Sequence, residues 1–189
     1  TDLFYASITR GYKAGGFNSE EDLPSEDLRD FDTEYQWNYE LGSKFSALQN
    51  NLINRVGVFY TDRRDLQLKS STAVPDGSGG IEFRDYLTNA GKGFSYGLEW
   101  EMNWAVLQGL NFNTSLGLLK TEITEHKNLD PDAFNLEERE AAHAPDYTYS
   151  ASINYVLTQY VAMQLGVEGK DEFFYSEGHN FKYKSYQLV

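Results

Sequence analysis

The feature that most constrains this chain is a strict alternation of residue types from Phe94 to Trp104. The large apolar residues there are Phe94, Tyr96, Leu98, Trp100, Met102 and Trp104, and between them lie Ser95, Gly97, Glu99, Glu101 and Asn103. Side chains alternate between the two faces of a β-strand, so the pattern predicts a strand with one apolar and one polar face. Strands of soluble proteins usually end after about 5–6 residues, whereas a tilted strand that crosses a membrane needs about 9–11. The length of the alternation favours a membrane-spanning strand, with Trp104 as an interface anchor before a turn at 105–109.

The same alternation returns along the rest of the chain. It predicts further strands at 3–13, 33–46, 52–68, 110–124, 147–155 and 161–169, with another beginning at 185–189. Short turns are expected at 47–51, 105–109 and 156–159, and long loops at 14–32, 69–83, 125–144 and 171–182, with a possible helical turn at 135–142. In outer-membrane barrels the long loops face outside and the short turns face the periplasm, and this order is consistent throughout. The sequence therefore predicts an all-β fold, a segment of an antiparallel transmembrane β-barrel with about seven to eight strands.

Composition agrees with a barrel. The chain has 189 residues, 40% of them hydrophobic and 15% aromatic. It contains no run of about 18 apolar residues, which excludes a transmembrane helix, whereas a barrel strand needs apolar residues only at alternate positions. The absence of cysteine removes disulfides and cysteine-based metal sites. A net charge of −13 without a basic cluster argues against a nucleic-acid partner.

The alternative fold is a soluble β-sandwich or barrel that acts as a binding module. Such a fold also buries one face of each strand and exposes the other. It does not explain why the apolar strands are long, or why the long connections all fall on one side.

Several segments resemble successive strand signatures from the C-terminal half of the TonB-dependent outer-membrane receptors, a family that includes the siderophore receptors. They are Y-A-S-I-T-R-G-Y-K-A-G-G-F-N (5–18), N-Y-E-L-G-S-K-F (38–45), V-F-Y-T-D (58–62), D-L-Q (65–67), N-A-G-K-G-F-S-Y-G-L-E (89–99), A-P-D-Y-T (144–148), Y-S-E-G-H-N (175–180) and S-Y-Q-L-V (185–189). The resemblance implies a barrel of about 22 strands that is closed by an N-terminal plug. It also implies uptake of a scarce nutrient, such as a ferric siderophore, across the outer membrane of a Gram-negative bacterium with energy from the TonB complex.

The chain opens on a strand pattern rather than on a signal peptide. It also lacks the plug, the TonB box, the earlier strands and the terminal aromatic strand of the family. We therefore expect residues 1–189 to form one partial β-barrel domain, a wall with its loops. Contact with the TonB complex would come through the missing N-terminal part. The expected surroundings are outer-membrane lipid and lipopolysaccharide, and no cofactor is predicted.

An outer-membrane hydrolase and a porin are the alternatives from other functional classes. His126, His143 and His179 lie in expected loops near serines and aspartates, but no G-x-S-x-G nucleophile motif is present, so the sequence does not predict an enzyme. Asp130 and Asp132 lack the glycine and terminal glutamate of an EF-hand loop, and no metal site is predicted.

Five charged residues are predicted to face the lumen, on three consecutive strands. They are Glu40, Lys44, Arg55, Glu99 and Glu101. In a barrel too wide to be filled by side chains, such residues meet water or a plug. We favour mutual neutralisation over a plug-binding role. In particular, Arg55 is predicted to pair with Glu99 or Glu101 across adjacent strands, where opposite charges stabilise one another.

The resemblance places substrate contacts on the outer loops and the upper wall. The candidates there are Phe17, Asn18, Arg63, His143 and His179. The loop at 125–144 has the most varied chemistry of the expected loops, and binding residues concentrate on loops that a rigid scaffold carries. It could capture a ferric chelate, or it could serve as an acidic shield at the lipopolysaccharide surface, and the sequence supports the two interpretations equally.

Overall fold

The computed structural model describes residues 2–19, 23, 25–126, 135–177 and 179–189. Its elements in chain order are β1 (Leu3–Lys13), β2 (Gly16–Phe17), the 3-10 helix η2 (Glu26–Leu28), β3 (Asp30–Phe31), β4 (Glu34–Ala47), β5 (Leu52–Pro75), β6 (Ile81–Leu107), β7 (Leu110–His126), β8 (Tyr147–Thr158), β9 (Val161–Lys170), β10 (Phe173–Ser176), β11 (His179–Tyr183) and β12 (Tyr186–Leu188). Among these residues, no helix is long and apolar enough to cross a bilayer.

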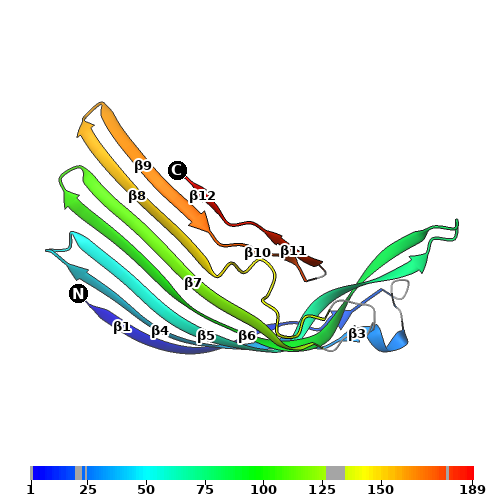
Figure 1. The fold of residues 1–189 in the computed structure, drawn as a ribbon. Coiled ribbons are helices and arrows are strands. Elements are labelled where there is room, and N and C mark those ends of the chain that lie inside the picture. Colours follow the sequence, from blue (N-terminus) through cyan, green and yellow to red (C-terminus); the bar gives the residue numbers. More distant parts are fainter. Residues whose placement is uncertain (1, 20–22, 24, 127–134, 178) are drawn as a thin grey trace.

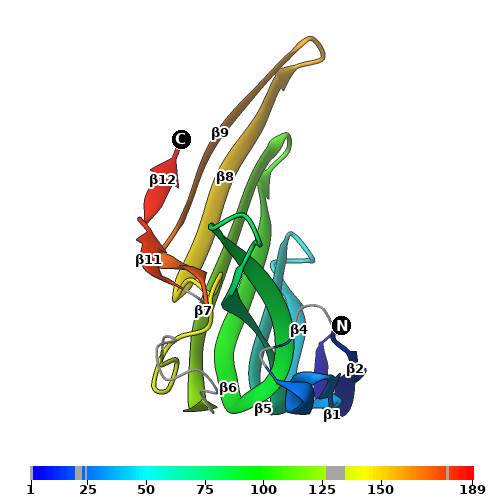
Figure 2. The ribbon, with the colours of Figure 1, turned by 90° about the vertical axis from the view of Figure 1, so that its right-hand side faces the viewer.

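Eight of the strands form one antiparallel sheet in the order β1-β4-β5-β6-β7-β8-β9-β12. They lie side by side in a single curved wall (Figure 1). The three short turns, between β4 and β5, β6 and β7, and β8 and β9, lie at one end of this wall, and the longer connections lie at the other (Figure 1). The view at right angles shows the twist of the wall, with β12 beside β9 (Figure 2). The predicted all-β barrel segment and the two-sided order of its connections are confirmed.

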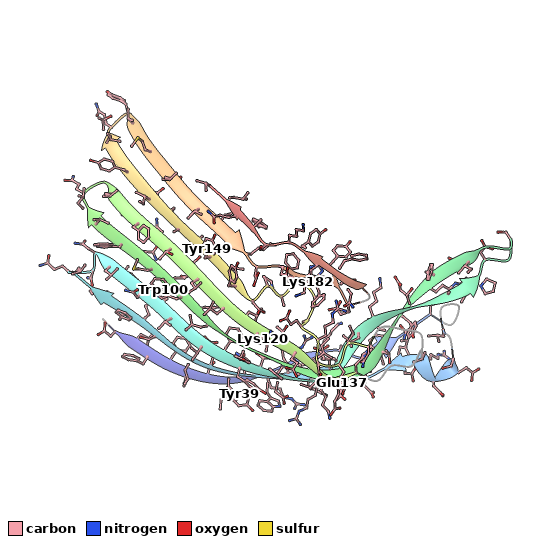
Figure 3. The ribbon with its side chains drawn as sticks, viewed as in Figure 1. Tyr39, Trp100, Lys120, Glu137, Tyr149 and Lys182 are labelled. Carbon is pink, nitrogen blue, oxygen red and sulfur yellow. The ribbon has the colours of Figure 1, made fainter. Side chains whose placement is uncertain are left out.

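The strand register sorts the side chains onto two faces, because residues directly opposed in an antiparallel ladder share a face. One row across five strands reads Leu41, Val58, Leu98, Leu118 and Tyr147. The adjacent row reads Gly42, Gly57, Glu99, Gly117, Thr148, Lys170 and Tyr186. Tyr39, which belongs to the apolar set, lies on the convex side of the wall (Figure 3). The convex face is therefore apolar, and the concave face carries small, polar and charged residues.

The prediction of a loop at 69–83 is wrong. β5 and β6 continue past the wall as a two-stranded ribbon that pairs from Leu68 and Thr88 outward to Pro75 and Ile81 (Figure 1). A ribbon that projects into water needs no continuous apolar face, so the alternation that marked the other strands is missing there. Its tip is a tight turn, in which Oδ1 of Asp76 accepts hydrogen bonds from the backbone N–H groups of Ser78 and Gly80.

Two other connections also differ from expectation. The segment 171–182 contains the hairpin of β10 and β11 rather than a plain loop. Residues 135–142 form turns and one bridge between Arg139 and Ile123, so the possible helical turn is wrong. The loop at 125–144 was predicted to capture a ferric chelate or to act as an acidic shield, and its residues 127–134 lie outside the described residues.

A line of extra residues crosses the sheet where the wall ends and the ribbon begins. Asp65 is unpaired in β5, Ala90 in β6 and Thr124 in β7, each causing a shift of register. Asp65 has a φ of 56°, in the left-handed region. Such β-bulges bend a strand and increase its twist, and the ribbon turns away from the wall at this line (Figure 1).

Leu98 should be intolerant of charge because it lies on the convex, apolar face of β6. Replacing it with arginine in the full-length receptor should lower the free energy of unfolding in a bilayer by about 2–4 kcal/mol if it lies near the midplane. The matched control is Ser95→Arg, which places the same side chain on the concave face of the same strand. Equal losses for the two variants in a folding titration would contradict the assignment of the faces.

Candidate functional site

The charged residues predicted to face the lumen do lie on the concave face. Lys44, Arg55 and Glu101 oppose one another in a single row across β4, β5 and β6. Nη1 of Arg55 lies 3.2 Å from Oε2 of Glu101, so the predicted pairing of Arg55 with a glutamate of the neighbouring strand is confirmed. Because both side chains are about half exposed, the pair contributes no more than about 1 kcal/mol.

Tyr5 is a member of this concave wall that the sequence did not single out. Its hydroxyl donates a hydrogen bond of 2.5 Å to Oε1 of Glu40. The ring lies directly over Gly42, where a Cβ atom would overlap it, whereas a Cβ at Gly57 would meet the Tyr5 hydroxyl only at 3.7 Å. The missing side chain at Gly42 therefore lets Tyr5 reach Glu40. Tyr5 and Glu40, together with Phe59 and Glu99, line a hollow of about 530 Å³ in the wall.

Arg63, a candidate ligand residue, is already paired at the upper end of the wall. Its Nε and Nη2 atoms donate to Oε1 of Glu34 at 3.1 and 2.6 Å. The Glu34 side chain is only 7% exposed, and its second oxygen accepts the backbone N–H of Gln67. A buried carboxylate needs such partners, because burial of an unpaired charge is costly. In this arrangement Arg63 stabilises the junction between β4 and β5.

Asn18, another candidate, fastens the segment after β1 to the β5–β6 ribbon. Its Nδ2 atom donates to the carbonyl oxygens of Leu28 and Leu87, both at 2.7 Å, and its Oδ1 atom accepts the N–H of Leu87 at 2.9 Å. The side chain thus pairs with Leu87 as a neighbouring strand would. All of its strong hydrogen-bonding groups are in use.

Gln67 and Asn89 act in the same way. Nε2 of Gln67 donates to the carbonyls of Ala14 and Asp32, both at 2.9 Å. Asn89 donates from Nδ2 to the carbonyls of Asp32 and Asp65 and accepts the N–H of Asp32. We call these three side chains, Asn18, Gln67 and Asn89, the amide clamp. It holds the segment 14–32 against the ribbon and so fixes β2, in which Phe17 remains 77% exposed.

Removal of one member of the amide clamp should loosen this segment. Asn18→Ala leaves carbonyl and N–H groups of Leu28 and Leu87 without partners, at a cost of about 1–3 kcal/mol. In the full-length receptor, backbone amides of the described residues between 14 and 32 should exchange faster with deuterium, while those of β7 and β8 stay protected. Asn103→Ala is the control, because Asn103 makes no side-chain hydrogen bond to any described residue. Unchanged exchange in Asn18→Ala would show that the clamp is dispensable.

His143 lies at the β10–β11 hairpin, within a cluster of aromatic rings. Its ring centre lies 5.9 Å from that of Phe173 and 6.2 Å from that of Tyr175, and Tyr183 lies 5.4 Å from both of these rings. The backbone N–H of His143 donates to the carbonyl of Phe174, which joins the loop to the hairpin. His143 was a candidate from the sequence, whereas the rings around it were not predicted. The high density of aromatic residues from 173 to 186 is the sequence feature that could have indicated this cluster.

His179 opposes Ser176 in the backbone ladder of the same hairpin. Its side chain lies outside the described residues.

Glu140 joins this hairpin to the wall. Its carboxylate pairs with Lys120 of β7 and lies 3.7 Å from Nζ of Lys182 in β11. Lys182 (Figure 3) also pairs with Glu172 at 3.1 Å. The ammonium group of Lys120 lowers the pKa of Glu140 below the ordinary value for a glutamate. Its ionised form is therefore the one that the folded chain stabilises.

This contact should make the hairpin sensitive to acid. Folding lowers the pKa of Glu140, so Glu140 stabilises the folded hairpin fully above the ordinary glutamate pKa of about 4.3. This stabilisation is lost as the pH falls through the pKa of Glu140 in the folded chain. Amides of β10 and β11 should lose protection in that acidic range. In Glu140→Gln they should already exchange faster at pH 7 and respond less to acid. Glu82→Gln, at the far end of the ribbon, is the control and should respond to acid as the native receptor does. If Glu140→Gln also showed the acid response of the native receptor, Glu140 would be ruled out.

The candidate residues fall into two groups at the end of the wall that carries the longer connections, which we call the open end. Phe17, Asn18 and Arg63 lie at the base of the ribbon, and His143 and the backbone of His179 lie at the β10–β11 hairpin. A hollow of about 220 Å³ lies between the two groups, bordered by Arg63 and Gln67 on one side and by Ala141 and Glu177 on the other. Within the described ranges, no three His, Cys, Asp or Glu side chains are placed to hold a metal ion.

Comparison with known proteins shows where this architecture belongs. The family model "TonB dependent receptor-like, beta-barrel" matches residues 1–189. The pesticin receptor of Yersinia enterocolitica (serotype O:8, biotype 1B) is 29% identical over 162 residues, which are 84% of this chain and 21% of that receptor. The chain thus spans about a fifth of the length of this curated relative.

Solved structures share the fold. The ferric yersiniabactin uptake receptor FyuA of Yersinia pestis matches with a TM-score of 0.72 and 23% identity over 98% of this chain and 26% of its own. The copper transporter OprC matches with a TM-score of 0.69 and 11% identity over 99% of this chain and 28% of its own. At such identities the likeness concerns the fold alone. The family is one of transport receptors rather than enzymes, and its members lie in the outer membrane of Gram-negative bacteria. This chain therefore belongs to the TonB-dependent receptor family and forms part of its β-barrel.

Proposed function

We propose that the receptor to which this chain belongs takes up a ferric siderophore, with energy from the TonB complex. The observation that carries the proposal is the gathering of aromatic and basic side chains at the open end of a polar wall. Phe17 and the rings around His143 offer apolar contact, and Lys170, which forms no ion pair with any described residue, brings positive charge. A ferric chelate combines an apolar body with negative oxygen atoms, and both kinds of contact suit it.

The relatives support the same cargo. One of the structures that share this fold is the ferric yersiniabactin uptake receptor FyuA of Yersinia pestis, and another is the ferric-catecholate import receptor Fiu of Escherichia coli K12. The copper transporter shares the fold as well, which makes copper the comparison that a test must include.

For the charged wall we propose mutual neutralisation, with two residues left for other contacts. Arg55 and Glu101 pair directly, and Glu40 accepts the hydroxyl hydrogen of Tyr5. Among the described residues, neither Lys44 nor Glu99 has an ion-pair partner. We infer that these two meet the plug of the complete receptor or the water around it. The coupling to TonB lies in the N-terminal part of that receptor, and the convex face meets lipid and lipopolysaccharide.

Uptake can be tested with the full-length gene in its host. Deletion of the gene should abolish ⁵⁵Fe accumulation from at least one member of a panel of catecholate, phenolate, hydroxamate and carboxylate ferric chelates, while ⁶⁴Cu accumulation stays normal. Collapse of the proton gradient in cells with the intact gene should produce the same loss, because transport against a gradient requires energy. Normal iron uptake from every chelate, with loss of copper uptake, would overturn the proposal.

A further inference from the structure

Arg10 of β1 is a cation on the convex, apolar face of the wall. It opposes Trp37 in the ladder between β1 and β4, so the two side chains share this face. Other cations of the face, Arg64, Lys92 and Lys120, each pair with a carboxylate. In contrast, no carboxylate of the described residues forms a salt bridge with Arg10. Its positive charge is therefore left for a partner outside this chain.

The guanidinium group of Arg10 is held by two aromatic rings. Its Cζ atom lies 4.2 Å from the centre of the Tyr35 ring and 5.7 Å from that of the Trp37 ring. Such cation–π contacts fix the position of a guanidinium group without using its N–H groups as donors to an oxygen. The side chain is exposed, so these donors are both ordered and accessible to an anion.

The strand register gives the depth of Arg10 in the membrane. A row that contains Tyr39, Tyr60 and Tyr96 crosses the convex face directly outside the apolar row described above. Aromatic belts of this kind mark the boundary between hydrocarbon and headgroups. Arg10 lies in the next row toward the open end, two residues beyond Ile8 and about 5 Å farther along the membrane normal when strand tilt is included. Because the longer connections of a barrel face outside, Arg10 lies at the headgroups of the outer leaflet.

The acidic residues in the same row do not cancel this charge. Asp62 is neutralised by Arg64, whose Nε atom lies 2.9 Å from its Oδ2 atom. Glu122 also belongs to the row, but it lies on β7, four strand spacings and roughly 19 Å from Arg10. The Debye length at physiological ionic strength is about 8 Å, so Glu122 has little effect there. The surface at Arg10 is therefore positive although the chain has a net charge of −13.

We propose that Arg10, held by Tyr35 and Trp37, binds a phosphate of the lipid anchor of lipopolysaccharide in the outer leaflet. The planar guanidinium group can donate two parallel hydrogen bonds to a phosphate, which is the geometry that favours arginine at such sites. Basic residues at the membrane surface recognise anionic headgroups in the same way. The inference rests on the proposed contact of the convex face with lipopolysaccharide, and it does not depend on the cargo.

The test uses the delipidated full-length receptor in detergent. It is titrated with lipid A that carries two phosphates, with the same lipid after removal of both phosphates, and with phosphatidylglycerol, and binding is measured by native mass spectrometry. Arg10→Gln should raise the Kd for phosphorylated lipid A about tenfold, the effect of losing a hydrogen bond between charged groups, and leave that for the phosphate-free lipid unchanged. Arg10→Lys keeps the charge without the planar fork and should give an intermediate Kd.

Lys13→Gln is the matched control. Lys13 lies on the same strand but opposes Glu34 on the concave face, so its replacement should change the Kd less than about twofold. Folding of each variant is checked by its heat-dependent mobility in gel electrophoresis.

The other possible results would overturn the proposal in distinguishable ways. If the native receptor binds no lipid A, both the contact with lipopolysaccharide and the Arg10 site are overturned. If lipid A binds but Arg10→Gln matches the native receptor, only the site is overturned. If phosphatidylglycerol binds as tightly as lipid A and depends equally on Arg10, the site accepts any lipid phosphate and its assignment to lipopolysaccharide is wrong.

Discussion

The pairing of backbone hydrogen bonds is the constraint on which this structure depends. Inside a bilayer no water can satisfy an N–H or C=O group, so every strand of the wall must have a neighbour on both sides. The order β1-β4-β5-β6-β7-β8-β9-β12 meets that demand throughout its interior by antiparallel pairing of neighbours. Once the ladder is formed, it fixes the face of the sheet on which each side chain lies. Each residue must face either lipid or lumen, and a polar concave face follows from an apolar convex one.

The groups at the open end of the wall are positioned in a different way. There the chain is in contact with water, and ordering comes from side chains that take the place of backbone partners. The amide clamp joins the segment 14–32 to β5 and β6 through hydrogen bonds to backbone groups on both sides. Glu140 links β7 to the β10–β11 hairpin through Lys120 and Lys182. The scaffold is thus rigid in lipid because of its backbone and ordered above the lipid because of a few polar side chains.

This division explains how far the sequence could predict the structure. Residues inside the bilayer obey a period of two, so the strands, the two faces and the pairing of Arg55 with a glutamate of β6 could be predicted from it. Strands outside the bilayer do not need this alternation. For that reason the ribbon from Lys69 onward and the β10–β11 hairpin were predicted as loops. Arg63 and Asn18 were named because of their position, but their contacts depend on residues far away in the chain, such as Glu34 and Leu87. Lys170 was not named, because the Tyr186 ring beside it belongs to another strand, β12.

The line of bulges at Asp65, Ala90 and Thr124 has an evolutionary consequence. In a strand with a period of two, an inserted or deleted residue would turn every later side chain to the wrong face. The bulges interrupt the regular ladder at the end of the wall, so changes of length in the ribbon beyond them do not reach the residues that face lipid. The outer part of this receptor can therefore diverge in length and sequence, under pressure from whatever it meets at the cell surface, while the part in the membrane stays the same.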